Sequence, residues 1–109
     1  MGKSSNPNRE VEAANAFYNA AEMGYAPSQN YLAWLYSTGI NGKTDAGKAA
    51  YWYGKAAVQG DATAQFNFGR LYVEGRGVYK DIDEAKKWYR KSAEQGNEAA
   101  KQALVELGR

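Results

Sequence analysis

The apolar positions of this chain fall into short runs at helical spacing, and glycines separate the runs. Between residues 45 and 60 the apolar positions follow one another at steps of three, one, three and one, which places them on one face of a helix. These positions are Ala49, Trp52, Tyr53, Ala56 and Ala57. Gly60 is a suitable stop, because glycine tolerates a left-handed backbone, and Asp61 is an expected N-cap for the next run. The pattern predicts a helix–turn–helix hairpin.

The same pattern along the whole chain predicts six helices, at roughly 10–23, 27–38, 46–59, 62–74, 82–95 and 98–107. Asp81 and Glu84 have the spacing of a capping box, and Asn97 is expected to cap the last helix. Residues 1–8 are polar and aperiodic, and we expect them to form a disordered tail.

The hairpin pattern recurs every 36 residues without a gap. Gly24, Gly60 and Gly96 keep this spacing, as do Trp52 and Trp88. Further sets with the same spacing are Phe17, Tyr53 and Tyr89; Leu35, Leu71 and Leu107; Asp45 and Asp81; Ala49 and Ala85; and Tyr36 and Tyr72. A fixed period of this length indicates a stacked repeat protein, in which neighbouring hairpins cover the apolar face that one hairpin leaves open.

The repeated residues resemble those of the Sel-one-like repeat (SLR) family, a helical-hairpin subfamily related to tetratricopeptide repeats. The resemblance rests on Ala49, Trp52, Tyr53, Ala56, Ala57, Gly60, Ala64, Gln65, Gly69, Leu71, Tyr72, Gly75, Arg76, Gly77, Val78, Asp81, Ala85, Trp88 and Tyr89. It is strong over residues 45–107 and weaker over 10–44, where Ala16 replaces a tryptophan and Asn41-Gly42 replaces a glycine–valine pair.

Period and resemblance together predict an all-α fold, a right-handed α-α superhelix (solenoid) of three stacked antiparallel helix-turn-helix repeats. The repeats are expected at about residues 9–44, 45–80 and 81–109, within one domain over 9–109. The third unit stops before its glycine-rich loop, so we expect a short array that is either a whole small protein or a fragment of a longer one.

Composition argues against catalysis. The chain has no cysteine and no histidine, which excludes disulfides and thiolate metal sites and removes the commonest general base and metal ligand. Its one tight acidic group, Asp81, Asp83 and Glu84, is interpreted as the favoured first turn of a helix. Gly75-Arg76-Gly77 is interpreted as an inter-repeat turn, because it lacks the residues that follow in phosphate loops. We therefore expect no cofactor, no metal and no enzymatic activity; a hydrolase acting on cell-wall material is the least favoured function.

Charge and hydropathy limit the partners. A net charge of +2 is too small to indicate nucleic-acid binding, and no apolar run has membrane-spanning length, so we expect no nucleic-acid partner and no membrane insertion. The N-terminus lacks the apolar core of a signal peptide. The compartment stays open between the cytoplasm and, after removal of a signal, the periplasm or the exterior.

Recognition is expected where the repeats differ. In the families that this chain resembles, the first helix of each hairpin lines the concave face. There Gly47 and Gly54 are expected to form a floor almost without side chains, surrounded by Asn15, Tyr18, Asn19, Lys48, Tyr51, Lys55, Lys87, Arg90 and Lys91. The cations are expected to hold acidic groups, and the two asparagines a peptide main chain. The alternative interpretation is a solvated basic face with Tyr18 packed over Gly54.

A second candidate surface is aromatic. Tyr25, Tyr31 and Trp34 stand where the next repeat has Asp61, Asn67 and Arg70. Large apolar groups at positions that are polar in sister units suggest a covered surface. Four candidates are expected to cover these aromatic side chains: the N-terminal tail, a preceding repeat, a partner, or a second copy of the chain that forms a homodimer through Tyr31 and Trp34.

The predicted function is that of a noncatalytic adaptor or scaffold. The resemblance implies this role, which such proteins often have in bacteria. It would bind another protein or an extended peptide, with acidic partners favoured, on its concave face. The alternative is an inhibitor or immunity-type protein that neutralises a specific enzyme or toxin.

Overall fold

The computed structural model describes residues 9–39 and 42–108, with side chains from residue 15 onward. It contains the helices α1 (Arg9–Glu22), α2 (Ala26–Thr38), α3 (Ala46–Val58), α4 (Ala62–Glu74), α5 (Ile82–Glu94) and α6 (Glu98–Leu107). All six predicted helices are confirmed, with ends that differ by no more than one residue. The tail expected at residues 1–8 lies outside the described part.

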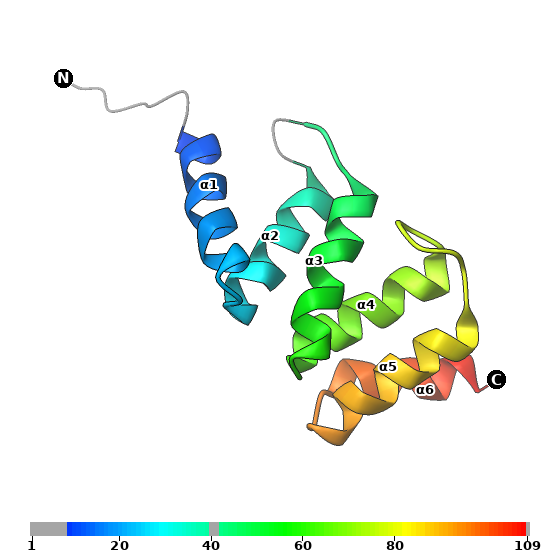
Figure 1. Cartoon of the computed structure of the whole chain (residues 1–109). Helices are drawn as coiled ribbons and strands as arrows, with labels where there is room; N and C mark the ends of the chain where they lie inside the picture. Colours follow the sequence, from blue (N-terminus) through cyan, green and yellow to red (C-terminus); the bar gives the residue numbers. More distant parts are fainter. Residues whose placement is uncertain (1–8, 40–41, 109) are drawn as a thin grey trace.

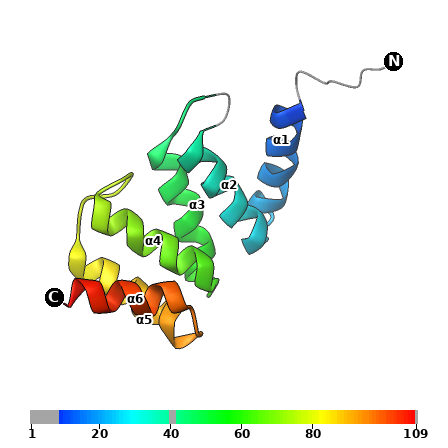
Figure 2. The same cartoon turned by 180° about the vertical axis from the view of Figure 1, so that it is seen from behind.

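Each helix packs against the next one along the chain, which produces an elongated stack of 57 × 24 × 21 Å. Figures 1 and 2 show the six helices winding from α1 at one end to α5 and α6 at the other. In Figure 1 the first helix of the last hairpin, α5, lies in front of α6, and in Figure 2 the order is reversed. The predicted all-α solenoid of stacked hairpins is confirmed.

Side-chain caps fix where four of the helices begin. The carboxylate of Asp61 accepts a hydrogen bond of 2.8 Å from the Ala64 amide at the start of α4. Asp45, Asp81 and Asn97 cap α3, α5 and α6 in the same way. An acceptor at the N-cap satisfies a backbone donor that has no partner within the helix. Helix α2 differs, because Tyr25 stands at its N-cap and makes no such bond.

The predicted capping box at Asp81 is only half formed. Asp81 accepts from the Glu84 amide at 3.0 Å, as expected, but its own amide donates to the Tyr72 carbonyl at 2.9 Å. The Glu84 carboxylate instead accepts from the Trp88 indole at 3.1 Å. The bond from the Asp81 amide to the Glu84 carboxylate that would complete a capping box is therefore not formed. The Asp81 amide joins the loop to α4, and the Glu84 carboxylate joins two successive turns of α5.

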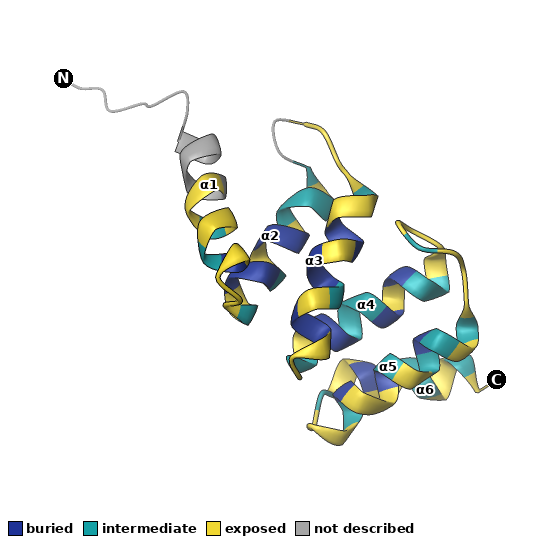
Figure 3. Cartoon of the chain, in the orientation of Figure 1, coloured by how far each residue is buried: buried dark blue, intermediate teal, exposed yellow. Residues whose placement is uncertain are grey.

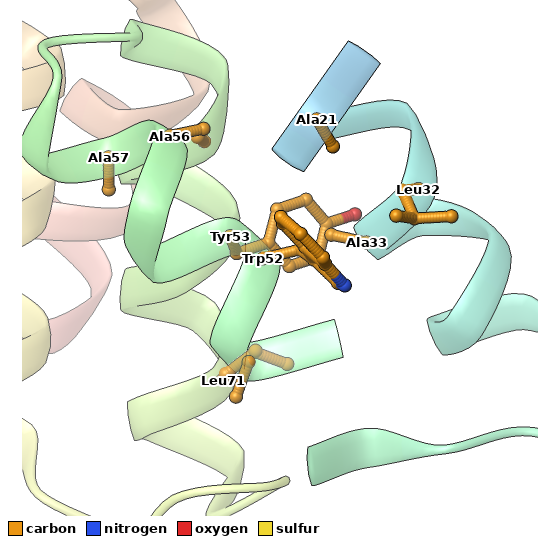
Figure 4. Packing of buried hydrophobic residues seen from close by; sticks show 10 residues of the cluster. Ala21, Leu32, Ala33, Trp52, Tyr53, Ala56, Ala57 and Leu71 are labelled. Carbon is orange, nitrogen blue, oxygen red and sulfur yellow. The ribbon is translucent and has the colours of Figure 1, made fainter. Parts of the chain in front are cut away.

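Alanines and aromatic rings fill the interior. Figure 3 shows buried positions along the inner sides of α2, α3 and α4, and Figure 4 shows the Trp52 and Tyr53 rings projecting from α3 toward α2. Both rings are only 3% exposed. The surrounding buried residues are Ala21, Leu32, Ala33, Ala50, Ala56, Ala57, Ala64 and Leu71. Small alanines bring the helix backbones close together, so that a few large rings can fill the remaining space.

Two equivalent junctions join the three hairpins, and a pair of glutamines crosses each. At the first junction, between α1–α2 and α3–α4, Gln59 Nε2 donates to Gln29 Oε1 at 2.7 Å, and Gln29 Nε2 donates to the Ala21 carbonyl at 2.9 Å. At the second junction, between α3–α4 and α5–α6, Gln95 donates to Gln65 at 3.0 Å. Sequence analysis missed this feature, although Gln29 and Gln65, like Gln59 and Gln95, are 36 residues apart.

Candidate functional site

The first-helix surface, meaning the exposed side chains of α1, α3 and α5, carries a cluster of three aromatic rings. The buried Trp52 ring meets Tyr18 of α1 and Tyr51 of α3 edge to face, at centroid distances of 5.8 and 5.0 Å. Tyr51 is 56% exposed and Tyr18 43%. A hydrogen bond to the Glu22 carboxylate raises the pKa of the Tyr18 hydroxyl above its usual value. The two tyrosines, predicted as site residues, therefore both contact one tryptophan.

Three lysines of this surface lie over aromatic rings. Lys55 Nζ is 5.4 Å from the centre of the Tyr51 ring, and Lys48 Nζ is 5.4 Å from that of Tyr36. Lys91 Nζ lies 5.9 Å from the Trp88 ring. Such contacts hold an ammonium group by its attraction to the ring face without neutralising its charge.

The other predicted cations differ in their surroundings. Lys87 is paired with the Glu84 carboxylate at 3.2 Å, so part of its charge is compensated. Arg90 is exposed on α5. Among the described residues, neither Lys55 nor Lys91 has a carboxylate within ion-pair distance. These two lysines are therefore better placed than Lys87 to bind an external anion.

Two shallow hollows flank the end of α3 on this surface. The first, of about 350 Å³, is lined by Glu22, Met23 and Gly24 at the end of α1, by Gln29 of α2, and by Lys55, Val58 and Gln59, so that it holds one carboxylate beside its lysine. The second, of about 360 Å³, lies between Val58, Gln59 and the α5 residues Trp88 and Lys91. Lys55 and Lys91 are one repeat apart. The same hollow thus occurs twice, with a lysine at the equivalent position each time.

The expected glycine floor is corrected at one of its two positions. Gly54 is not open, because a Cβ atom there would lie 3.1 Å from the Phe68 ring of α4. It is a contact point between helices. The Tyr18 ring, which the alternative interpretation packs over Gly54, lies edge to face with Trp52. Gly47 is exposed, and its nearest neighbour would be the Asp45 side chain at 3.5 Å.

On α1, the exposed Asn15 and Asn19 stand one helical turn apart, as the spacing predicted.

The aromatic residues of the second candidate surface do gather in space. Tyr31 stacks on Trp34 with a centroid distance of 5.8 Å and an interplanar angle of 26°, and Phe17 of α1 lies 4.3 Å from Tyr31. Trp34 is 50% exposed. Tyr25, 60% exposed, stands at the start of the same helix.

The glycine-rich loop between α4 and α5 forms a larger hollow of about 730 Å³, lined by Tyr72, Gly75, Gly77, Val78, Tyr79 and Asp81. Gly75 ends α4 in the left-handed conformation, and its amide and that of Arg76 both donate to the Leu71 carbonyl. These amides complete the helix C-terminus and do not point to a bound anion. The interpretation of Gly75-Arg76-Gly77 as a turn is confirmed.

Within residues 9–39 and 42–108, no three acidic side chains come together as ligands for a metal ion. None of the helices described is long and apolar enough to cross a membrane.

The family model of the Sel1 repeat matches residues 26–61 and 62–97. The chain belongs to the Sel1 repeat family. Each matched unit pairs a second helix with the first helix of the next hairpin, α2 with α3 and α4 with α5. Sel1 repeats generally serve as protein-interaction modules, and the family is typically noncatalytic.

Solved structures of Sel1 proteins share this fold. A Sel1 repeat protein from Oxalobacter formigenes is 43% identical, with a TM-score of 0.83 over 88% of this chain and 72% of that one. The protective antigen c5321 of uropathogenic Escherichia coli, which displays an SLR fold, is 40% identical, with a TM-score of 0.83 over 86% of this chain and 20% of that one. Helicobacter pylori cysteine rich protein B is 27% identical, with a TM-score of 0.82 over 88% of this chain and 72% of that one. No curated protein gives a significant match.

Proposed function

We propose that this chain is a noncatalytic adaptor whose first-helix surface binds an extended, acidic segment of another protein. The observation that carries the proposal is the pair of equivalent hollows on either side of Val58 and Gln59, with Lys55 in one and Lys91 in the other. A segment that crosses this ridge would place one acidic side chain in each hollow.

The chemistry of the surface favours an acidic partner. Lys55 and Lys91 pair with no carboxylate of the described residues, and each is held over a ring. Opposite charge on the partner steers its approach and fixes its register.

Apolar contacts would supply much of the affinity. Val58 on the ridge is 72% exposed, Met23 beside the first hollow 87%, and Tyr51 56%. Tyrosine and methionine are enriched in protein interfaces, and Val58 adds further apolar area to this surface. The glutamine pair Gln29–Gln59 holds the ridge to the first hairpin, so little ordering is needed when a partner binds. The family match lends no support to the alternative of an enzyme or toxin inhibitor.

Selection from a random library of blocked ten-residue peptides tests the proposal. We expect enrichment of peptides with two acidic positions separated by an apolar one, and binding that weakens as salt is raised. The double variant Lys55→Glu/Lys91→Glu should bind the selected peptides at least about tenfold more weakly, because both lysines are replaced by residues that repel an acidic side chain.

The matched control is Lys101→Glu, which reverses a charge on α6, away from the hollows, and should leave binding within about twofold. Selected peptides without acidic enrichment, or equal binding by the double variant and the wild type, would contradict the proposal.

A further inference from the structure

A third hollow, of about 350 Å³, lies between the second helices α2 and α4, with Tyr53 of α3 also in its wall. We call it the first groove. Its side walls come from α2 and from the start of α4, and none of its lining residues lines the two hollows of the first-helix surface. It is a separate site.

One wall of the first groove is a stacked aromatic pair. Tyr31 and Trp34 are stacked at an interplanar angle of 26°, and the Phe17 ring of α1 lies 4.3 Å from the Tyr31 ring. Both rings of the pair stay 40% and 50% exposed. A tryptophan face that is open to solvent is the strongest aromatic acceptor for a cation.

The opposite wall carries a carboxylate that has no cationic partner. Asp61 Oδ1 accepts from the Ala64 amide at 2.8 Å and from Asn30 Nδ2 at 3.4 Å. No described residue donates to its second oxygen or forms an ion pair with it. Among the described residues that line the first groove, Asp61 is the one charged side chain.

At the equivalent place between α4 and α6 the chain supplies an aromatic ring and a guanidinium of its own. Phe66, one repeat after Asn30, packs on Tyr89 at 5.6 Å, and the Arg70 guanidinium lies 5.8 Å from the Phe66 ring. Arg70 stands one repeat after Trp34, and Asn97 one repeat after Asp61. The equivalent place therefore already contains a guanidinium on an aromatic ring. No cation of the described residues lines the first groove, although Arg70 lies near enough to Tyr53 to lower its pKa in part.

We propose that the first groove binds an arginine side chain of a protein partner, with the guanidinium over Trp34 and paired with the free oxygen of Asp61. Guanidinium suits this place better than ammonium, because its flat face stacks on a ring while its edge donates to a carboxylate. A two-fold dimer through the same patch would bring two Asp61 carboxylates into one interface, which disfavours a second copy as the occupant. The chain thus offers a basic surface on its first helices and an arginine-binding groove on its second helices.

An NMR titration tests this inference. The blocked tripeptide acetyl-Gly-Arg-Gly-amide is added to the ¹⁵N-labelled protein, and the indole N–H signals of the tryptophans are followed. The chain has three tryptophans, and the Trp34 signal is assigned by its absence from Trp34→Phe. We expect a saturable shift of the Trp34 signal, with no shift of the buried Trp52. The Gln-centred tripeptide should cause no saturable shift.

Variants that import residues of the sister repeats sharpen the test. Asp61→Asn keeps a capping residue, as Asn97 shows, but removes the charge and should weaken arginine binding at least about fivefold. Asn30→Phe should abolish binding by filling the groove as Phe66 does. The matched control Asp81→Asn makes the same change at the start of α5 and should bind like the wild type.

Several results would overturn the inference. They are equal shifts with the glutamine tripeptide, unchanged affinity in folded Asp61→Asn, or a Trp34 response to acetyl-Pro-Pro-Pro-amide in place of the arginine peptide. A Trp34 signal that depends on protein concentration, with a doubled mass in light scattering, would assign the groove to a second copy. Asp61→Asn decides the matter even if Asn30→Phe does not fold.

Discussion

The two junctions of this solenoid share a pair of glutamines but differ in their other contacts. At the second junction Ser92 also donates to the Ala62 carbonyl and Gln95 to the Gly60 carbonyl, both at 2.7 Å. Gln29–Gln59 and Gln65–Gln95 cross the junctions at 2.7 and 3.0 Å, in equivalent positions. Around them the rings differ, since Trp52 meets Tyr18 of the preceding hairpin, whereas Trp88 meets Phe68.

The same contrast holds on the second helices. Phe66 packs on Tyr89 between α4 and α6, while its counterpart Asn30 lines the first groove together with Tyr53. The bonds between glutamine side chains join each hairpin to the next and occur at both junctions, where neighbouring repeats are in contact. Side chains outside this framework are free to vary, and both proposed sites consist of such residues.

Removal of the Trp52 ring should have the largest effect of the substitutions considered. Trp52 is 3% exposed and contacts two tyrosines, so Trp52→Ala should reduce the free energy of unfolding by about 3–5 kcal/mol. Trp88 is only partly buried, and Trp88→Ala should cost clearly less. Urea unfolding followed by far-UV circular dichroism measures both. Equal losses would show that the two junctions are packed alike.

Much of the helical framework could be predicted from the sequence, because spacing along one helix determines which residues share a face. The apolar run from Ala49 to Ala57 and the caps Asp61 and Asn97 depend only on residues a few positions apart. Because the pattern repeats every 36 residues, the helices and caps predicted in one hairpin could be placed in the other two.

Contacts between helices could not be predicted in this way. Phe68 of α4 covers Gly54 of α3. The spacing of residues along either helix does not show where the two helices meet, so this contact could not be predicted. Glu84 lacks the capping-box bond because the Trp88 indole, one turn later, competes for its carboxylate. The open first groove depends on the size of Asn30 relative to Phe66, which matters only once α2 and α4 are placed side by side.

Substitution of the buried glutamines should reduce the free energy of unfolding less than Trp52→Ala does, and by the same amount at both junctions. Gln29→Leu and Gln65→Leu each remove a buried donor to a backbone carbonyl, to which the Gly24 or Gly60 amide still donates. Each variant should therefore lose about 0.5–1.5 kcal/mol of unfolding free energy. Because the bonds are equivalent, the two variants should agree within about 0.5 kcal/mol in urea unfolding. A loss confined to one variant would mean that only one junction depends on its glutamines.

The buried tyrosines should produce the smallest effect, one that appears only at high pH. Burial raises the pKa of Tyr53 and of Tyr89 above 10.0, and nearby Arg70 lowers both in part. The folded state thus resists ionisation, so stability is complete below about pH 10 and falls as pH rises toward the folded pKa. Phe17 occupies the equivalent position in the first hairpin, which makes Tyr89→Phe a compatible change. Between about pH 9 and pH 11 the wild type should lose more thermal stability than Tyr89→Phe; parallel losses would mean that the Tyr89 hydroxyl ionises without unfolding.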